Sequence, residues 1–236
     1  MSLLVLENIE KKFDKKEVLK DVTFQFETGK IYGLLGKNGA GKTTLFNCIN
    51  EDLMADNGTY KLEEEGIQRA IESKDIGYVL STPVVPEFLT AREFLKFFID
   101  INKVKQTIDK SIDEYFDMVT IQPEDRDKLL KDYSHGMKNK MQMLVNFIAN
   151  PTVLLLDEPL TSFDVVVADE MKELLRQMKK DHIIIFSTHI MELALDLCDE
   201  IVILNNGVLT EVSQEGKDVD KFKDKIIGIL KGEIHV

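Results

Sequence analysis

Residues 36–44 read GKNGAGKTT, a spacing of glycines, lysine and threonines that suits the binding of phosphate groups. The glycines let the backbone approach phosphates that a Cβ atom would keep away. The backbone N–H groups and the start of a following helix add partial positive charge. Lys42 is placed to reach the β- and γ-phosphates of a nucleotide, and the Thr43 hydroxyl to ligate Mg²⁺. The residues expected around the phosphates are Asn38, Gly39, Ala40, Gly41, Lys42, Thr43 and Thr44.

A pair of adjacent acids follows an apolar run in residues 153–159, which read VLLLDEP. At the carboxyl end of a strand, both side chains can turn toward the crevice where ligands bind. Asp157 would then hold Mg²⁺ directly or through water. Glu158 would polarise the attacking water. The alternative is a strand that ends in a polar turn, and the phosphate loop upstream argues against it.

The remaining pattern alternates short apolar runs with helical spacing. Strands are expected at 3–7, 18–26, 31–35, 76–80, 153–157, 182–186 and 200–204. Helices are expected from the phosphate loop to about 50, and at 90–101, 108–119, 165–180 and 190–197. Such alternation with fully apolar strands predicts an α/β fold around a mostly parallel, buried sheet. Residues 82–150 interrupt it as a helical lobe.

The composition excludes several classes of protein. The net charge is −12 (30 Lys and Arg against 42 Asp and Glu), so a protein that acts mainly by binding nucleic acid is not expected. Two cysteines, Cys48 and Cys198, make neither a disulfide framework nor a zinc site, and they suit a reducing cytoplasm. Neither a signal peptide nor a membrane-spanning run is evident, so any role at a membrane would pass through a separate subunit.

The order of these motifs resembles the nucleotide-binding subunit of ABC transporters over nearly the whole chain. Residues 133–140, YSHGMKNK, are similar to the ABC signature, and 161–164, TSFD, to the D-loop. His189 matches the switch histidine. Phe13 matches the aromatic residue that stacks on adenine, with Val18 beside it. The form of the signature and the compact length look most like the ATPases of bacterial exporters.

The resemblance implies a P-loop NTPase fold of ABC type, with an N-terminal antiparallel β subdomain beside the core. It implies one ABC ATPase domain over 1–236, with a core formed by 1–81 and 151–212, a signature lobe at 82–150 and a tail at 213–236. ATP and Mg²⁺ would be the ligands. The residues implied in catalysis are Lys42, Glu158 and His189. Ser134 and Gly136 are implied in binding the partner's ATP. The residues implied at the metal are Thr43, Asp157 and Ser81.

The same resemblance implies a second ATPase protomer and a separate transmembrane permease. The permease would dock on residues 81–87 and on the helical lobe, which places the chain at the cytoplasmic face of a membrane. ATP binding would close the dimer, and hydrolysis would open it. Export is the direction of transport that the resemblance favours.

Two positions depart from the family pattern. Ser81 stands where the family has the glutamine of the Q-loop, and its shorter side chain would need water to reach Mg²⁺. His135 replaces the first glycine of the signature, which would strain the backbone if that position requires a positive φ.

Alternatives remain open at this point. The chain could be a regulatory subunit that binds ATP and scarcely hydrolyses it, which Ser81 and His135 favour. It could also be an ABC ATPase not coupled to transport, although it has no basic arm or long coiled coil. A GTPase is disfavoured because Asn102 and Lys103 are followed by Val104 and Lys105 instead of a guanine motif. The cargo, the direction of transport and the choice between homodimer and heterodimer are not encoded in these motifs.

Overall fold

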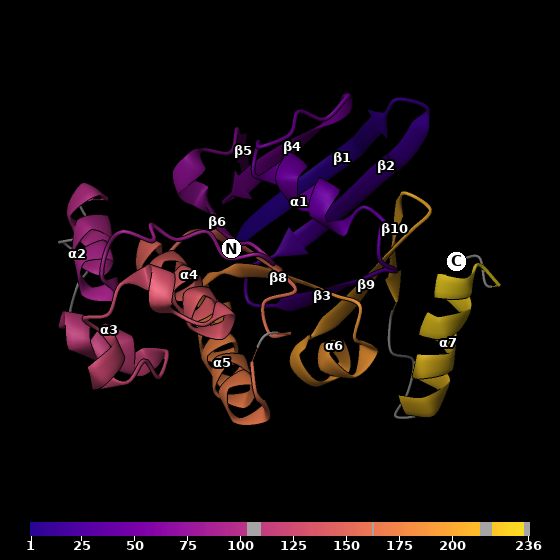
Figure 1. Ribbon diagram of the computed structural model, residues 1–236. Coiled ribbons are helices and arrows are strands. Elements are labelled where there is room, and N and C mark those ends of the chain that lie inside the picture. Colours follow the sequence, from indigo (N-terminus) through magenta and orange to yellow (C-terminus); the bar gives the residue numbers. More distant parts are fainter. Residues whose placement is uncertain (103–109, 162, 213–218, 234–236) are drawn as a thin grey trace.

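A computed structural model describes residues 1–102, 110–161, 163–212 and 219–233, which form two β-sheets with helices packed around them (Figure 1). The first sheet is antiparallel, with strand order β2-β1-β4-β5. Its strands are β1 (Ser2–Phe13), β2 (Lys16–Glu27), β4 (Asn57–Glu64) and β5 (Ile67–Arg69). Buried side chains of β1 and β2, such as Leu6 and Leu19, pack with those of the core sheet.

The second sheet is the core, with strand order β10-β9-β3-β8-β7-β6. All neighbours are parallel except β9 and β10. The strands are β3 (Ile31–Leu35), β6 (Ile76–Val79), β7 (Val153–Asp157), β8 (Ile183–Thr188), β9 (Glu200–Asn205) and β10 (Val208–Val212). Every residue of β3, β7 and β8 is buried, as expected for parallel strands covered on both faces. Because parallel strands end at one edge, the segments that follow these three strands meet there.

The helices that the structure describes before α7 fall into a core group and a lobe group. The core helices are α1 (Lys42–Ile49), α5 (Val165–Met178) and α6 (Met191–Leu197). The lobe helices are α2 (Ala91–Ile101), α3 (Ile112–Met118) and α4 (His135–Ala149). Capping boxes begin two of them, Thr90 with Glu93 at α2 and Ser111 with Glu114 at α3.

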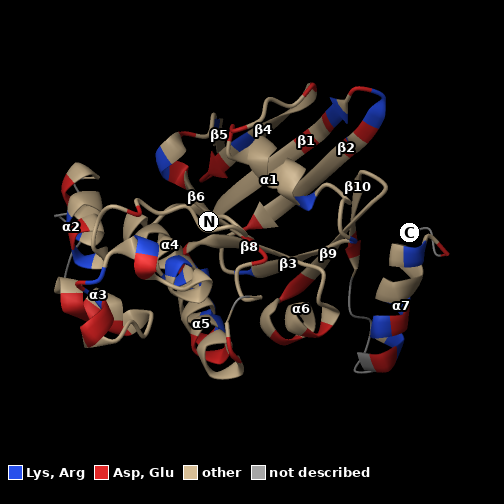
Figure 2. Ribbon diagram, in the orientation of Figure 1, with Lys and Arg blue, Asp and Glu red and all other residues tan. Residues whose placement is uncertain are grey.

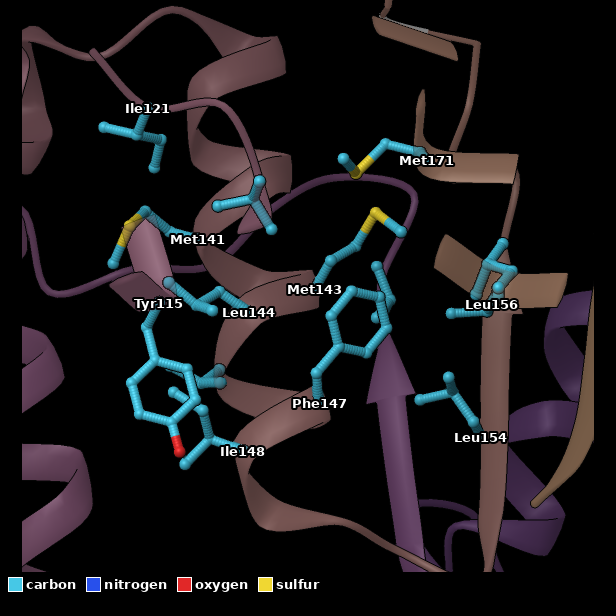
Figure 3. Packing of buried hydrophobic residues seen from close by; sticks show 14 of the residues in the cluster. Tyr115, Ile121, Met141, Met143, Leu144, Phe147, Ile148, Leu154, Leu156 and Met171 are labelled. Atoms are coloured by element: carbon cyan, nitrogen blue, oxygen red, sulfur yellow. The ribbon is translucent and has the colours of Figure 1, made fainter. Parts of the chain in front are cut away.

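Helix α4 joins the lobe to the sheet. Figure 3 shows Met141, Leu144 and Ile148 on the side of α4 that faces Tyr115, while Phe147 lies on the side of β7. All of these side chains belong to one buried cluster. The lobe is therefore attached through a continuous apolar core.

Ion pairs hold the lobe helices together, and Figure 2 shows the positions of acidic residues along the ribbon of α3. Asp113 lies 3.0 Å from nitrogens of both Arg92 and Arg126. Arg126 also pairs with Asp117 and lies over the ring of Phe116. Since the Arg126 side chain is almost fully buried, these partners offset its desolvation.

The C-terminal helix α7 (Val219–Lys231) lies beside β9 and β10, at the opposite end of the molecule from α2 and α3 (Figure 1). Phe222, Ile226 and Ile229 are buried against the core. The side-chain amide of Asn205 donates to the carbonyl oxygen of Ile229 at 2.7 Å. The rest of the predicted tail, 213–218 and 234–236, lies outside the described residues.

The predicted α/β fold, with a mostly parallel core sheet, an antiparallel β-sheet and a helical lobe, is confirmed. Strands β4, β5 and β10 were not predicted from the pattern. In β4 only Leu62 is buried, which explains why its sequence shows little hydrophobic alternation. The helix expected at 108–119 is α3, and residues 108 and 109 lie outside the described part of the chain. No described helix is long and apolar enough to span a membrane.

Candidate functional site

The loop between β3 and α1 adopts a conformation that requires glycine. Gly39 and Gly41 have φ values of 77° and 108°, in the left-handed region that other residues rarely adopt. A Cβ atom on Gly41 would lie 2.9 Å from Cγ1 of Val18. One on Gly36 would lie 2.8 Å from the carbonyl oxygen of Leu204. The glycines therefore set both the curvature of the loop and its close packing on β2 and β9.

Substituting Gly41 with Ala is expected to lower both stability and ATP affinity. The methyl group would contact Val18, and the left-handed backbone costs about 1–2 kcal/mol for a residue with a Cβ atom. Gly66→Ala is the matched control, because Gly66 has φ of 81° and nothing within 4 Å of its Cβ position. Thermal unfolding should show the larger loss for Gly41→Ala, and only this variant should lose ATP affinity. Equal losses in both variants would contradict the packing argument.

The loop forms one wall of a cavity of about 420 Å³ at the carboxyl edge of the core sheet. The lining residues are Phe13, Lys16, Val18, Asn38, Gly39, Ala40, Gly41, Lys42, Thr43, Thr44, Ser81, Asp157 and Glu158. Every predicted site residue lines this cavity except Ser134, Gly136 and His189. Residues far apart in the sequence are thus brought to one cavity.

Asp157 is buried at the end of β7 and is held at both carboxylate oxygens. The hydroxyl of Thr43 donates to Oδ2 at 2.7 Å. The hydroxyl of Ser187 donates to Oδ1 at 2.5 Å. A hydroxyl that donates its proton keeps lone pairs for a cation. Thr43 and Asp157 therefore form a pair of hard oxygen donors at the start of α1.

Glu158 follows in a left-handed conformation, with φ of 51°. Its Oε1 lies 2.8 Å from Nδ1 of His189 and 3.9 Å from Nζ of Lys42. Its Oε2 accepts a hydrogen bond from the hydroxyl of Thr188 at 3.3 Å. His189 is thus connected to the cavity through Glu158, although it does not line the wall itself.

Lys42 begins α1 with its side chain only 7% exposed. Its ammonium donates to the carbonyl oxygen of Gly36 at 2.8 Å. Burial lowers the pKa of Lys42, and the nearby carboxylates of Glu158 and Asp157 oppose that shift. A poorly hydrated cation attracts a phosphate more strongly than one in bulk water does.

The cavity also has an apolar end. Phe13, the last residue of β1, is 46% exposed, so one face of its ring is accessible to a base. Val18 on β2 is half-buried beside the phosphate loop. Lys16, between them in the sequence, also lines the cavity.

Ser81 lies in the cavity wall, after the end of β6. The preceding backbone N–H of Leu80 donates to Oε1 of Gln142, which projects from α4. A glutamine from the lobe therefore holds the main chain next to the position where the family carries its own glutamine. The role of Ser81 at a metal stays a prediction.

The signature segment begins α4 at a distance from the cavity wall. Ser134 is the N-cap, and its hydroxyl accepts from the N–H of Met137 at 3.2 Å. Gly136 lies in the first turn, and neither residue lines the cavity. His135 is the first helical residue and does not have a positive φ, so the backbone strain considered for it does not arise. Contact of this segment with a partner's ATP stays a prediction.

The segment similar to the D-loop lies between β7 and α5. The hydroxyl of Thr161 donates to the carbonyl oxygen of Glu158 at 2.9 Å. Asp164 is the N-cap of α5 and accepts from the backbone of Val166 and Val167. Ser162 lies outside the described residues. The D-loop is therefore tied directly to Glu158.

The residues present fit a nucleotide with Mg²⁺. The cavity joins an apolar end at Phe13 to a loop whose glycines allow close approach of phosphates. Among the described residues, no group of three or more His, Cys, Asp or Glu side chains could hold a metal alone. Mg²⁺ is usually held by one or two carboxylates together with substrate phosphates. Thr43 and Asp157 would be its protein ligands.

Sequence reasoning missed three residues at this site: Lys16, Ser187 and Thr188. The two hydroxyl residues close an otherwise apolar strand, directly before His189. Polar residues at the carboxyl end of a buried strand were the available signal.

Comparisons with known proteins identify the family and the fold. The sequence profile described as ABC transporter matches residues 19–161, more than half of the chain. The ABC transporter ATP-binding protein YxlF of Bacillus subtilis (strain 168) is 32% identical over 216 residues, which cover 91% of this chain and 71% of that protein. Two solved structures share the fold.

The first, an ATP-binding subunit of an ABC transporter, has a TM-score of 0.80 at 24% identity and covers 95% of this chain and 99% of that one. The second is a dimeric ATP-binding cassette in a post-hydrolysis state bound to ADP and Pi, with a TM-score of 0.74 at 20% identity. It covers 91% of this chain and 100% of that one.

Proposed function

This chain belongs to the ABC transporter family as an ATP-binding ATPase domain, and from that premise we propose that it powers a transporter through ATP-driven closure of a dimer. One observation carries the proposal. Lys42, Thr43, Asp157 and Glu158 line a single cavity, and His189 contacts Glu158 at its edge. Export is the direction that the signature favours.

In the proposed mechanism the base of ATP stacks on Phe13 and the triphosphate lies along residues 38–44. Lys42 and the loop N–H groups stabilise charge on the γ-phosphoryl group. Mg²⁺, when bound at Thr43 and Asp157, supplies further neutralisation of that charge. Glu158 orients the attacking water and accepts its proton, while His189 fixes the carboxylate from the other side.

A second protomer would complete each site. Ser134 and Gly136 open a helix whose N-terminus suits an anion, yet they do not line this chain's own cavity. Val165 and Val166, just after the D-loop, are 87% and 67% exposed. Exposed apolar side chains beside catalytic segments support an interface that forms when ATP is bound.

A transmembrane permease is the proposed partner at residues 81–87, the residues just after them and the lobe, which would place the chain at the cytoplasmic face of a membrane. Large apolar side chains are exposed on both elements. Val84 and Phe88 lie on the loop, and Phe97 and Ile101 lie on α2. These side chains suit a surface that packs against a helix of another subunit.

Val84→Asp and Glu87→Lys are expected to weaken recovery of this permease at least tenfold when the tagged chain is purified from membranes of its own cells. Val84→Asp places a charge in the apolar surface, and Glu87→Lys replaces the partner of Lys138, now 2.7 Å away, with a like charge. Met54→Asp is the matched control, because Met54 is also largely exposed, 82% against 70% for Val84, but lies beside β4. ATP hydrolysis by the isolated chain should not change. Equal recovery of a multi-spanning subunit with all variants would contradict the docking site.

A weakly hydrolysing regulatory subunit is the second candidate, and Ser81 in place of a glutamine is the observation that favours it. Phosphate release from ATP by the purified chain separates the two functions. The proposed function predicts turnover that requires Mg²⁺, whereas the regulatory subunit would bind ATP with almost none.

A further inference from the structure

Two hydroxyl side chains at the end of β8 contact the two acids, although neither belongs to the motifs of the site. Ser187 bonds to Asp157 and Thr188 to Glu158, at 2.5 Å and 3.3 Å. Both hydroxyl residues are fully buried. Since consecutive residues of a strand point to opposite faces, each hydroxyl reaches a different carboxylate.

The contact with Asp157 follows from the strand register. Ser187 is paired directly with Asp157 where β8 lies beside β7. It occupies Oδ1, so the carboxylate turns its other oxygen, Oδ2, toward Thr43 and the phosphate loop. A hydrogen bond to the oxygen that does not face the metal fixes the orientation of a ligating carboxylate. Losing such a partner typically weakens metal affinity about 10–100-fold.

The contact with Glu158 has a different basis. The hydroxyl oxygen of Thr188 accepts from the backbone N–H of Ile190 at 3.1 Å, which leaves its proton for Oε2 of Glu158. Oε1 contacts His189. The carboxylate of Glu158 is therefore held at both oxygens, one by Thr188, the last residue of β8, and the other by His189, which follows it.

We propose that Ser187 and Thr188 are positioning residues with separate tasks: Ser187 orients Asp157 for the metal, and Thr188 orients Glu158 for the attack of water. The inference rests on the proposed function, because it assigns both residues through acids that this function uses. It predicts that loss of one hydroxyl affects metal binding and loss of the other affects turnover.

Ser187→Ala is expected to weaken binding of Mn²⁺ in the presence of ATP about tenfold or more. Free Mn²⁺ is measured by electron paramagnetic resonance, which needs no hydrolysis. ATP affinity in EDTA should stay within about twofold of wild type, since the proposed contact of Asp157 is with the metal and not with the adenine base. Ser187→Cys keeps the volume but offers a weaker donor, and an intermediate Mn²⁺ affinity is expected.

Thr188→Val is expected to show the opposite pattern. Its Mn²⁺ affinity should stay within about twofold of wild type, while kcat at saturating Mg²⁺ and ATP falls about tenfold. Thr188→Ser retains the hydroxyl and should restore most of kcat, which a loss of packing alone would not do. If Ser187→Ala fails to fold, Ser187→Cys tests the prediction for the metal. If Thr188→Val fails to fold, Thr188→Ala, which also lacks the hydroxyl, tests the prediction for kcat.

Unchanged Mn²⁺ affinity in Ser187→Ala, or the same loss of both quantities in the two variants, would overturn the inference. The wild-type chain serves as the reference for the underlying function. If wild type itself neither binds Mn²⁺ with ATP nor releases phosphate, the proposed function fails. If wild type does both and the variants do not separate, only the division of tasks fails.

Discussion

Replacing Glu158 with Gln is expected to reduce phosphate release about 10²–10⁴-fold while ATP still binds. The amide has the shape of the carboxylate but cannot accept a proton from water. Its neighbours remain in place, since Thr188 can still donate to the amide oxygen and His189 still faces the side chain. Steady-state phosphate release and equilibrium ATP binding, measured on the same preparation, give the two quantities.

Glu192→Gln is the matched control, because Glu192 is exposed on α6 and does not line the cavity. This variant should hydrolyse ATP at the wild-type rate. Unchanged turnover in Glu158→Gln would show that another group serves as the base. Loss of ATP binding in it would show that Glu158 supports the loop and not the reaction.

Replacing Lys42 with Met is expected to weaken ATP binding about 10–100-fold, the loss expected for a charge-assisted hydrogen bond. Met fills the space of the buried side chain but carries no charge. Lys42 now contacts the carbonyl oxygen of Gly36, and a phosphate would replace or share that contact. ATP affinity is measured without hydrolysis, by titration of a fluorescent ATP analogue in EDTA.

Lys37→Met tests whether the effect belongs to the position or to charge in general. Lys37 is in the same loop but is exposed and does not line the nucleotide cavity. Its replacement should change ATP affinity by less than about threefold. Similar losses in both variants would contradict a specific role for Lys42.

The strongly periodic parts of the fold could be predicted from the sequence. Apolar runs such as 153–157 and 31–35 are typical of parallel strands covered on both faces, and the phosphate loop is expected to have a strand before it and a helix after it. The antiparallel sheet was harder to predict from the sequence. In β4 only Leu62 is buried, so its pairing with β1 depends on contacts that are distant in the sequence.

The site shows the same difference between features set by local sequence and features set by contacts distant in the sequence. That Lys42, Asp157 and Glu158 meet at one cavity could be predicted from motifs, because each motif depends on local spacing. Ser187 and Gln142 could not, because their contacts with Asp157 and with the backbone of Leu80 arise from strand register and from the packing of α4. His135 shows the reverse error: the sequence suggested strain, and the helix begins early enough to avoid it.

We expect ATP binding to close a dimer of this chain and hydrolysis to open it. The most direct measurement is the mass of Glu158→Gln in solution, without nucleotide and with Mg²⁺ and ATP, together with the amount of ATP bound. Each chain should bind one ATP, and the mass should double from 27.0 kDa. A chain that binds ATP and stays monomeric would contradict closure as a homodimer. A chain that binds no ATP would contradict the proposed function.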